Sequence, residues 1–206
     1  MKHIGYIDIH CHKASGNLDV KEIVQDIHSL GIHPWMAGDV DSEVINNIIN
    51  IIKGNENKQI VAIGECGIDK LCTTPLQVQT DIFKKEIELS EKYKLPVIIH
   101  CVKALDEVLL VKKQMNATLP WIWHGFRGKP QQLEQILRAG FYVSFGYRYN
   151  KDSLHACPLK RLFLETDMGD KTIEEVYEQV SKELCISKEE LATSISTNCQ
   201  SVFGHF

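Results

Sequence analysis

The sequence predicts an α/β protein, a TIM-type (β/α) barrel in which parallel strands alternate with helices. Three observations predict this class. Short apolar runs alternate along the chain with longer amphipathic segments, which is the pattern of βαβ units. The apolar runs are continuous, as in strands that are covered on both faces. The length of 206 residues fits either eight units of about 26 residues or a distorted barrel with seven strands, and we expect one domain over residues 1–206.

The elements of the first half follow from local patterns. An apolar run at residues 4–9 predicts the first strand, and Asp41-Ser42 opens a helix whose isoleucines recur at helical spacing. Residues 10–34 offer two short strands with little room for a helix between them. We therefore expect strands at 4–9, 22–27, 29–33, 60–64 and 97–100, and helices at 41–53 and 76–94.

The second half continues the alternation. Apolar runs predict strands at 120–124, 141–145 and 161–165, and amphipathic segments predict helices at 104–115 and 130–139. Two further helices open on patterns typical of a capping box, Thr172-x-x-Glu175 and Ser187-x-x-Glu190.

Composition excludes several classes. Apolar residues make up 44% and charged residues 24%, so the chain is neither disordered nor fibrous. The formal net charge of −4 leaves no basic excess for non-specific coating of nucleic acid, although local basic patches stay open. Asp8 and His10 interrupt any leader-like apolar region, and no run approaches the ~18 residues of a membrane span. Because no apolar run is long enough, we expect no membrane partner. Seven cysteines without a C-x-x-C pair, with no export signal, favour reduced thiols in a cytoplasm.

Six side chains of metal-binding type stand at the predicted carboxyl ends of strands. In a closed barrel these ends converge on one face, which holds the active site. His10 and His12 are two residues apart on an extended chain, so they point to the same side. The mixed nitrogen and oxygen set suits Zn, Mn, Fe, Co or Ni. The set is His10, His12, Glu65, His100, His124 and Asp167.

Six ligands exceed the three or four that a single catalytic zinc uses. Two divalent ions about 3.5–4 Å apart, bridged by a carboxylate, would use all six ligands. Such a pair binds a phosphoryl or acyl oxygen, generates hydroxide near neutral pH and stabilises the leaving group. The sequence therefore predicts a two-metal hydrolase.

The ordered motifs that surround these ligands resemble those of the TatD-type metal-dependent hydrolases, which are amidohydrolase-like TIM barrels. The resemblance runs from residue 6 to residue 203. The motifs are Asp8-x-His10-x-His12, Gly31-Ile32-His33-Pro34-Trp35, Ile63-Gly64-Glu65-Cys66-Gly67-Ile68-Asp69, Pro96-Val97-Ile98-Ile99-His100-Cys101, His124-Gly125-Phe126-x-Gly128, Leu164-Glu165-Thr166-Asp167 and Asn198-x-x-x-Val202-Phe203.

The resemblance implies a deoxyribonuclease with 3′–5′ exonuclease activity on single-stranded DNA. It assigns His10, His12 and Asp167 to a first ion of a pair whose identity (Zn, Mn, Mg, Ni, Co or Fe) stays open. It makes Glu65 the bridge to a second ion, which His100 and His124 complete. Asp167 would also orient or deprotonate the attacking water, so Asp167 and Glu65 are the expected catalytic residues.

The chain departs from the resemblance where the substrate binds. Val102 stands where such proteins usually carry Arg, a bidentate phosphate ligand. Lys103 or Arg127 can replace that Arg, and we expect these two residues and His33, at the mouth of the site, to contact substrate. The chain is also some 50 residues shorter than typical members, with material missing between His12 and Gly31 and after Asp167.

These departures keep other functions open. The first alternative is a metallohydrolase of a small phosphoester, amide or lactone. The second is a non-catalytic metal-binding protein, against which the intact Asp167 argues. Phosphoesterases of the PHP type also begin with D-x-H-x-H, but they lack the Glu165-Thr166-Asp167 strand end.

Overall fold

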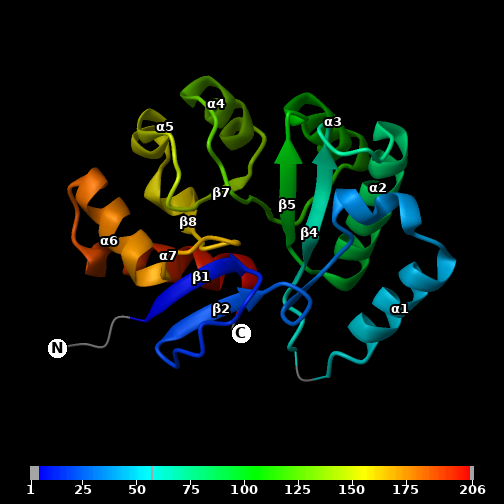
Figure 1. The fold of residues 1–206 in the computed structure, drawn as a ribbon, viewed down its shortest axis with the longest axis horizontal. Coiled ribbons are helices and arrows are strands. Elements are labelled where there is room, and N and C mark those ends of the chain that lie inside the picture. Colours follow the sequence, from blue (N-terminus) through cyan, green and yellow to red (C-terminus); the bar gives the residue numbers. More distant parts are fainter. Residues whose placement is uncertain (1–4, 57, 205–206) are drawn as a thin grey trace. The chain divides into compact units, whose positions relative to one another are not determined.

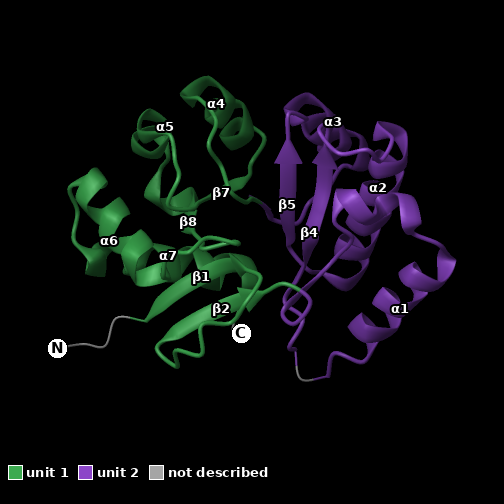
Figure 2. Ribbon diagram, in the orientation of Figure 1, with its two compact units in different colours: residues 1–25, 123–205 green, residues 26–122, 206 purple. Residues whose placement is uncertain are grey.

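The computed structural model describes residues 5–56 and 58–204 (Figure 1). Two compact units divide the chain, as Figure 2 shows. Unit 1 comprises the described residues of 1–25 and 123–205, and unit 2 those of 26–122. The boundary falls after Gln25 and again after Ile122, so unit 1 combines segments from both ends of the chain. That the whole chain forms one domain stays a prediction.

The first strands of unit 1 pair without a helix between them. β1 (Tyr6–Cys11) runs parallel to β2 (Val20–Val24), with Tyr6 opposite Val20. The connection over residues 12–19 holds no helix. The strand expected at 22–27 lies at 20–24, and the backbone leaves the extended conformation at Asp26, whose φ is 63°. Residue 4 of the first predicted strand lies outside the described residues.

The rest of unit 1 comes from the last third of the chain. β7 (Tyr142–Phe145) and β8 (Leu162–Leu164) pair in parallel, close to the positions expected. The longest helix of unit 1, α7 (Lys188–Phe203), packs against β1 and β8. The remaining helices are α4 (Pro130–Arg138), α5 (Lys151–Ala156), η2 (Leu159–Arg161) and α6 (Ile173–Leu184).

Helix capping in unit 1 agrees only in part with the sequence patterns. Thr172 and Glu175 form the complete capping box that was expected at the start of α6. Ser187 caps α7 by accepting from the Glu190 N–H, but the reciprocal bond from Ser187 N–H to the Glu190 side chain is not formed. The sequence also missed α5, because six residues are too few to show a helical period.

Unit 2 is built on a second set of parallel strands. β3 (Ser29–Leu30) pairs with β4 (Ala62–Asp69), and β4 pairs with β5 (Val97–Val102). The short β6 (Trp121–Trp123) begins in unit 2 and ends at the boundary. The helices are η1 (Pro34–Asp39), α1 (Ser42–Lys53), α2 (Leu76–Tyr93) and α3 (Leu105–Met115), and Figure 1 shows α2 and α3 beside β4 and β5.

Unit 2 corrects the predicted strand ends. β4 runs to Asp69 rather than ending at residue 64, and β5 runs to Val102 rather than ending at residue 100. Glu65 and His100 therefore lie inside their strands, as His10 lies inside β1. The apolar runs end before the strands do, because the carboxyl halves of the strands carry the candidate polar side chains.

Close backbone contact positions β4. A Cβ atom added to Gly31 would lie 2.7 Å from the Cα of Gly64, so only glycine fits at residue 31. The described part of the chain holds eight strands, the larger of the two numbers expected. Among the described residues, no helix is both long enough and apolar enough to cross a membrane.

Candidate metal centre

Unit 1 brings together three of the predicted ligands. His10 lies in β1, and His12 follows the strand end at Cys11. The Asp167 Oδ1 lies 3.8 Å from the His10 Nε2 and 3.4 Å from the His12 Nε2. The Asp167 N–H donates to the His10 carbonyl at 2.9 Å, and Asp167 has a φ of 54°, in the left-handed region that Asp tolerates. The backbone thus fixes where this carboxylate stands.

A buried glutamate supports the fourth ligand of unit 1. Glu165 is fully buried, and its Oε1 lies 3.2 Å from the Nδ1 of His124. The rings of His10 and His124 are 4.5 Å apart. A carboxylate on one ring nitrogen fixes the tautomer and leaves the other nitrogen for a metal. Glu165 was not among the predicted site residues, although the Glu165-Thr166-Asp167 motif contained it.

Asp8 supports the turn that carries Asp167. Its buried carboxylate accepts from the Thr166 N–H at 3.1 Å and from the Thr166 hydroxyl at 2.5 Å. Burial raises the pKa of Asp8 to about 7, although the bonds from Thr166 act in the opposite direction. The D-x-H-x-H motif therefore contributes a support as well as two candidate ligands.

Unit 2 forms a second group from Glu65, His100 and His33. The Glu65 Oε1 lies 2.6 Å from the His100 Nδ1 and 3.6 Å from the His33 Nε2. The two histidine nitrogens, His33 Nε2 and His100 Nδ1, are 3.3 Å apart. His33, expected only as a substrate contact, thus lies among the candidate ligands of unit 2.

Asp69 stands behind this second group. Its Oδ2 lies 3.6 Å from the His100 Nε2 and accepts from the indole Nε1–H of Trp35 at 2.7 Å. Burial raises the pKa of Asp69, but bonds from Trp35 and the Leu71 N–H, with the nearby His100, outweigh it and hold the pKa below the ordinary value. Asp69 is therefore an ionised acceptor behind His100.

The predicted ligands divide between the units. His10, His12, His124 and Asp167 belong to unit 1, and Glu65 and His100 to unit 2. Lys103 and Arg127 are exposed, in the loops that follow β5 and β6. Lys103 has a φ of 53°, so the chain turns sharply there. Their role toward substrate stays a prediction.

The donor chemistry of each unit fits a divalent metal ion. His10, His12 and Asp167 offer ligand atoms within 4.8 Å of one another, and so do His33, Glu65 and His100. Imidazole nitrogen combined with carboxylate oxygen is the set that Zn and neighbouring transition metals prefer. Together, parallel strands and His/carboxylate groups define a metal-dependent hydrolase.

Comparison with known proteins identifies the family. The model of the TatD related DNase family matches residues 7–204, so the chain belongs to that family. An uncharacterized metal-dependent hydrolase, YabD of Bacillus subtilis, is 27% identical over 197 residues, covering 85% of this chain and 76% of that protein. The 3'-5' ssDNA/RNA exonuclease TatD of Erwinia billingiae is 32% identical over 148 residues, covering 66% of this chain and 55% of the relative. The expectation of a hydrolytic enzyme is confirmed.

Solved structures confirm the fold class. The crystal structure of YJJV, a TatD homologue from Escherichia coli, matches with a TM-score of 0.85 at 21% identity, covering 99% of this chain and 100% of that one. A TatD family hydrolase from Entamoeba histolytica matches with a TM-score of 0.82 at 16% identity, covering 98% and 99%. The protein therefore has the TIM-type barrel fold of this family.

Proposed function

We propose that this protein is a two-metal nuclease that hydrolyses phosphodiester bonds of single-stranded DNA from the 3′ end. The observation that carries the proposal is the presence of two His/carboxylate groups, one in each unit. The names of two relatives support it, the Erwinia exonuclease and a human protein named 3'-5' RNA nuclease TATDN2, which is 28% identical over 151 residues. That alignment covers only 19% of the human protein.

His10, His12 and Asp167 would hold one ion. Glu65 and His100 would hold the other, and the assignment of His124 to that second ion, with Glu65 as a bridge, stays a prediction from the sequence. Bound divalent ions would polarise a phosphoryl oxygen and lower the pKa of water. The metal identity stays open among Zn, Mn, Mg, Ni, Co and Fe.

The side chains of the protein have separate tasks in hydrolysis. Water adds to phosphorus while one P–O ester bond breaks, and the water proton must leave. Asp167 can accept that proton, because its carboxylate is partly exposed and the backbone bond to His10 holds it in place. Glu165 orients His124, and Asp69 orients His100.

Metal-loaded protein tests this function directly. We expect it to shorten a 3′-hydroxyl single-stranded oligonucleotide, and His12→Ala and Asp167→Ala to abolish the cleavage. His155→Ala is the matched control, because His155 is also an exposed histidine of unit 1 but pairs with Glu183 on the outer helix α6. Metal analysis of the wild-type protein should give about two ions per chain. Cleavage that survives both site substitutions would contradict the proposal.

One observation favours a second candidate, hydrolysis of a small phosphoester, amide or lactone. Val102, at the end of β5, leaves the protein without an Arg at the position where the resemblance expects a phosphate ligand. Turnover of small esters without cleavage of any DNA would support this candidate. All seven cysteines are free thiols in the structure, which fits the cytoplasm as the proposed compartment.

A further inference from the structure

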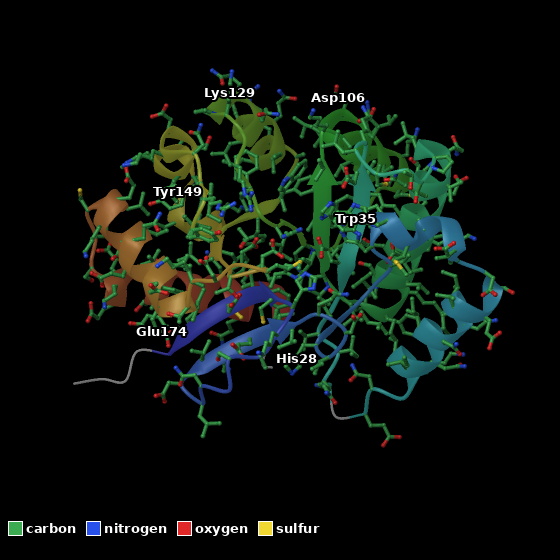
Figure 3. The ribbon with its side chains drawn as sticks, in the orientation of Figure 1. His28, Trp35, Asp106, Lys129, Tyr149 and Glu174 are labelled. Carbon is green, nitrogen blue, oxygen red and sulfur yellow. The ribbon has the colours of Figure 1, made fainter. Side chains whose placement is uncertain are left out.

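Trp35 is the most exposed aromatic side chain beside the candidate metal group of unit 2. It keeps 61% of its surface accessible, whereas Trp121 and Trp123 are buried. Leu71, with 64% of its surface accessible, lies two residues after the end of β4 at Asp69. Tryptophan side chains are usually largely buried in folded proteins. A large exposed one beside candidate ligands therefore needs an explanation. Figure 3 labels Trp35, on the short helix η1.

One buried carboxylate, that of Asp69, binds the Trp35 side chain and the Leu71 backbone. The Asp69 Oδ2 accepts from the indole Nε1–H of Trp35, and its Oδ1 accepts from the Leu71 N–H, each at 2.7 Å. The Trp35 carbonyl accepts from the Thr74 hydroxyl at 3.3 Å. The indole is therefore fixed along its nitrogen edge while much of its surface faces solvent. A preorganised surface costs less conformational entropy when a ligand binds it.

The same carboxylate connects Trp35 to the candidate ligands. Asp69 Oδ2, which binds the indole, also lies 3.6 Å from the His100 Nε2. The Trp35 ring centroid is 4.7 Å from that of His33 and 6.4 Å from that of His100. A group stacked on this indole would therefore lie close to His33 and His100, two candidate ligands of unit 2.

We infer that Trp35 is a stacking subsite for the nucleobase next to the scissile phosphate. This inference rests on the proposed nuclease function. Every nucleobase presents a π face, so stacking on one aromatic ring binds single strands with little sequence preference. The flat face of a base also covers exposed apolar surface that the indole otherwise leaves in water.

Binding without hydrolysis tests the subsite. The probe is a phosphorothioate-linked thymidine tetranucleotide, compared with strands that carry an abasic residue at the terminal or the penultimate 3′ position. We expect Trp35→Ala to weaken binding of the intact tetranucleotide about 5- to 100-fold, the range for one stacked base. For one of the two abasic strands, the wild type and Trp35→Ala should bind with the same affinity. Trp35→Phe keeps a π face and should retain most of the affinity.

Intrinsic fluorescence gives a second readout. Because Trp35 is the only exposed one of the three tryptophans, quenching on addition of the tetranucleotide should disappear in Trp35→Phe. Leu110→Ala, which removes an exposed apolar side chain from the outer helix α3, is the control and should change nothing. Equal weakening of all three strands by Trp35→Ala, or no weakening, overturns the subsite.

The outcomes separate this inference from the proposed function. Cleavage of DNA by the wild type, with binding unaffected by Trp35→Ala, overturns the subsite alone. Binding that depends on Trp35 and on one base, without cleavage in any metal, overturns the nuclease function alone. A wild-type protein that binds none of the strands overturns the subsite, and cleavage assays then decide the function.

Discussion

The two ligand groups differ in the exposure of their carboxylates. In unit 1 the histidine His10 is fully buried, while His12 and the carboxylate of Asp167 keep 37% and 30% of their side-chain surface exposed. In unit 2 the carboxylate of Glu65 is 5% exposed, and the histidines His33 and His100 are the more accessible members. A partly exposed carboxylate can meet water and exchange a proton, whereas a buried one is suited to holding a cation. We therefore propose that Asp167 of unit 1 transfers the proton and that Glu65 of unit 2 chiefly holds metal.

Paired substitutions of the two carboxylates give the largest effect and can break this assignment. We expect Asp167→Asn to lower kcat about 10²- to 10⁴-fold, the usual contribution of a general base. Glu65→Gln should also lose activity, but through weaker metal binding. Excess metal should then restore Glu65→Gln by mass action and leave Asp167→Asn inactive. Steady-state cleavage rates over a metal titration measure both.

The control for that pair is Glu183→Gln, because Glu183 is an acidic residue of unit 1 that pairs with Lys151, away from the ligands. It should keep wild-type activity at every metal concentration. Full recovery of Asp167→Asn activity at high metal would show that Asp167 only binds metal. The proposed difference in role between Asp167 and Glu65 would then be wrong.

The residues behind the ligands extend the comparison. Glu165 contacts His124 at 3.2 Å from a fully buried position, whereas Asp69 also binds Trp35 and Leu71. We expect Glu165→Gln to weaken metal binding about 10- to 100-fold, as other supports of metal-binding histidines do. Calorimetric titration with Zn²⁺ measures it. Glu134→Gln, an exposed substitution on α4, should leave the affinity unchanged.

A buried glutamate outside the candidate ligand groups, Glu86, should affect the stability of unit 2. Glu86 of α2 is buried beneath the segment that carries His33, and its Oε1 accepts from the Ile32 N–H at 2.6 Å. Burial raises the pKa of Glu86 well above 4.5, so between 4.5 and its raised pKa the folded protein binds more protons than the unfolded chain. The stability that this group contributes is therefore present below pH 4.5 and is lost as the pH rises toward the folded pKa.

Glu86→Gln removes this penalty and can keep the bond to Ile32. We expect the variant to be more stable than the wild type at pH 8 by roughly 1–3 kcal/mol, or about 2–10 °C in Tm. Near pH 4 the two proteins should have the same Tm. Thermal unfolding at both pH values measures the difference, and a variant less stable than the wild type at pH 8 would contradict the raised pKa.

Much of the fold, and most of the candidate ligands that the structure groups together, could be predicted from the sequence. Continuous apolar runs marked the strands, and the ordered polar side chains at their ends marked the candidate ligands, because parallel strands place their carboxyl ends on one face. Strand ends were wrong at β4 and β5, where polar residues continue the extended backbone to Asp69 and Val102.

Other features depend on tertiary contacts that no local pattern reports. Glu165 adjoins a recognised ligand in sequence, but only the fold brings it to His124, 41 residues earlier. The same holds for Asp69, whose bond to Trp35 joins segments 34 residues apart. The six-residue α5 is too short for a periodic signal.

The smallest predicted effect compares the exposed cations of the two units. Lys103 and Arg127 follow β5 and β6, and both are expected to contact the substrate backbone. Each Ala substitution should raise KM about 2- to 10-fold with little change in kcat, and should reduce the salt dependence of binding by about one phosphate contact. Lys129→Ala, an exposed cation at the start of α4, is the control. Because Arg127 offers a planar fork and Lys103 a point charge, Arg127→Lys should recover only part of the loss, whereas Lys103→Arg should be tolerated. If KM and the salt dependence stay at wild-type values in both Ala variants, the substrate is held without these cations, and a small uncharged molecule becomes the better candidate.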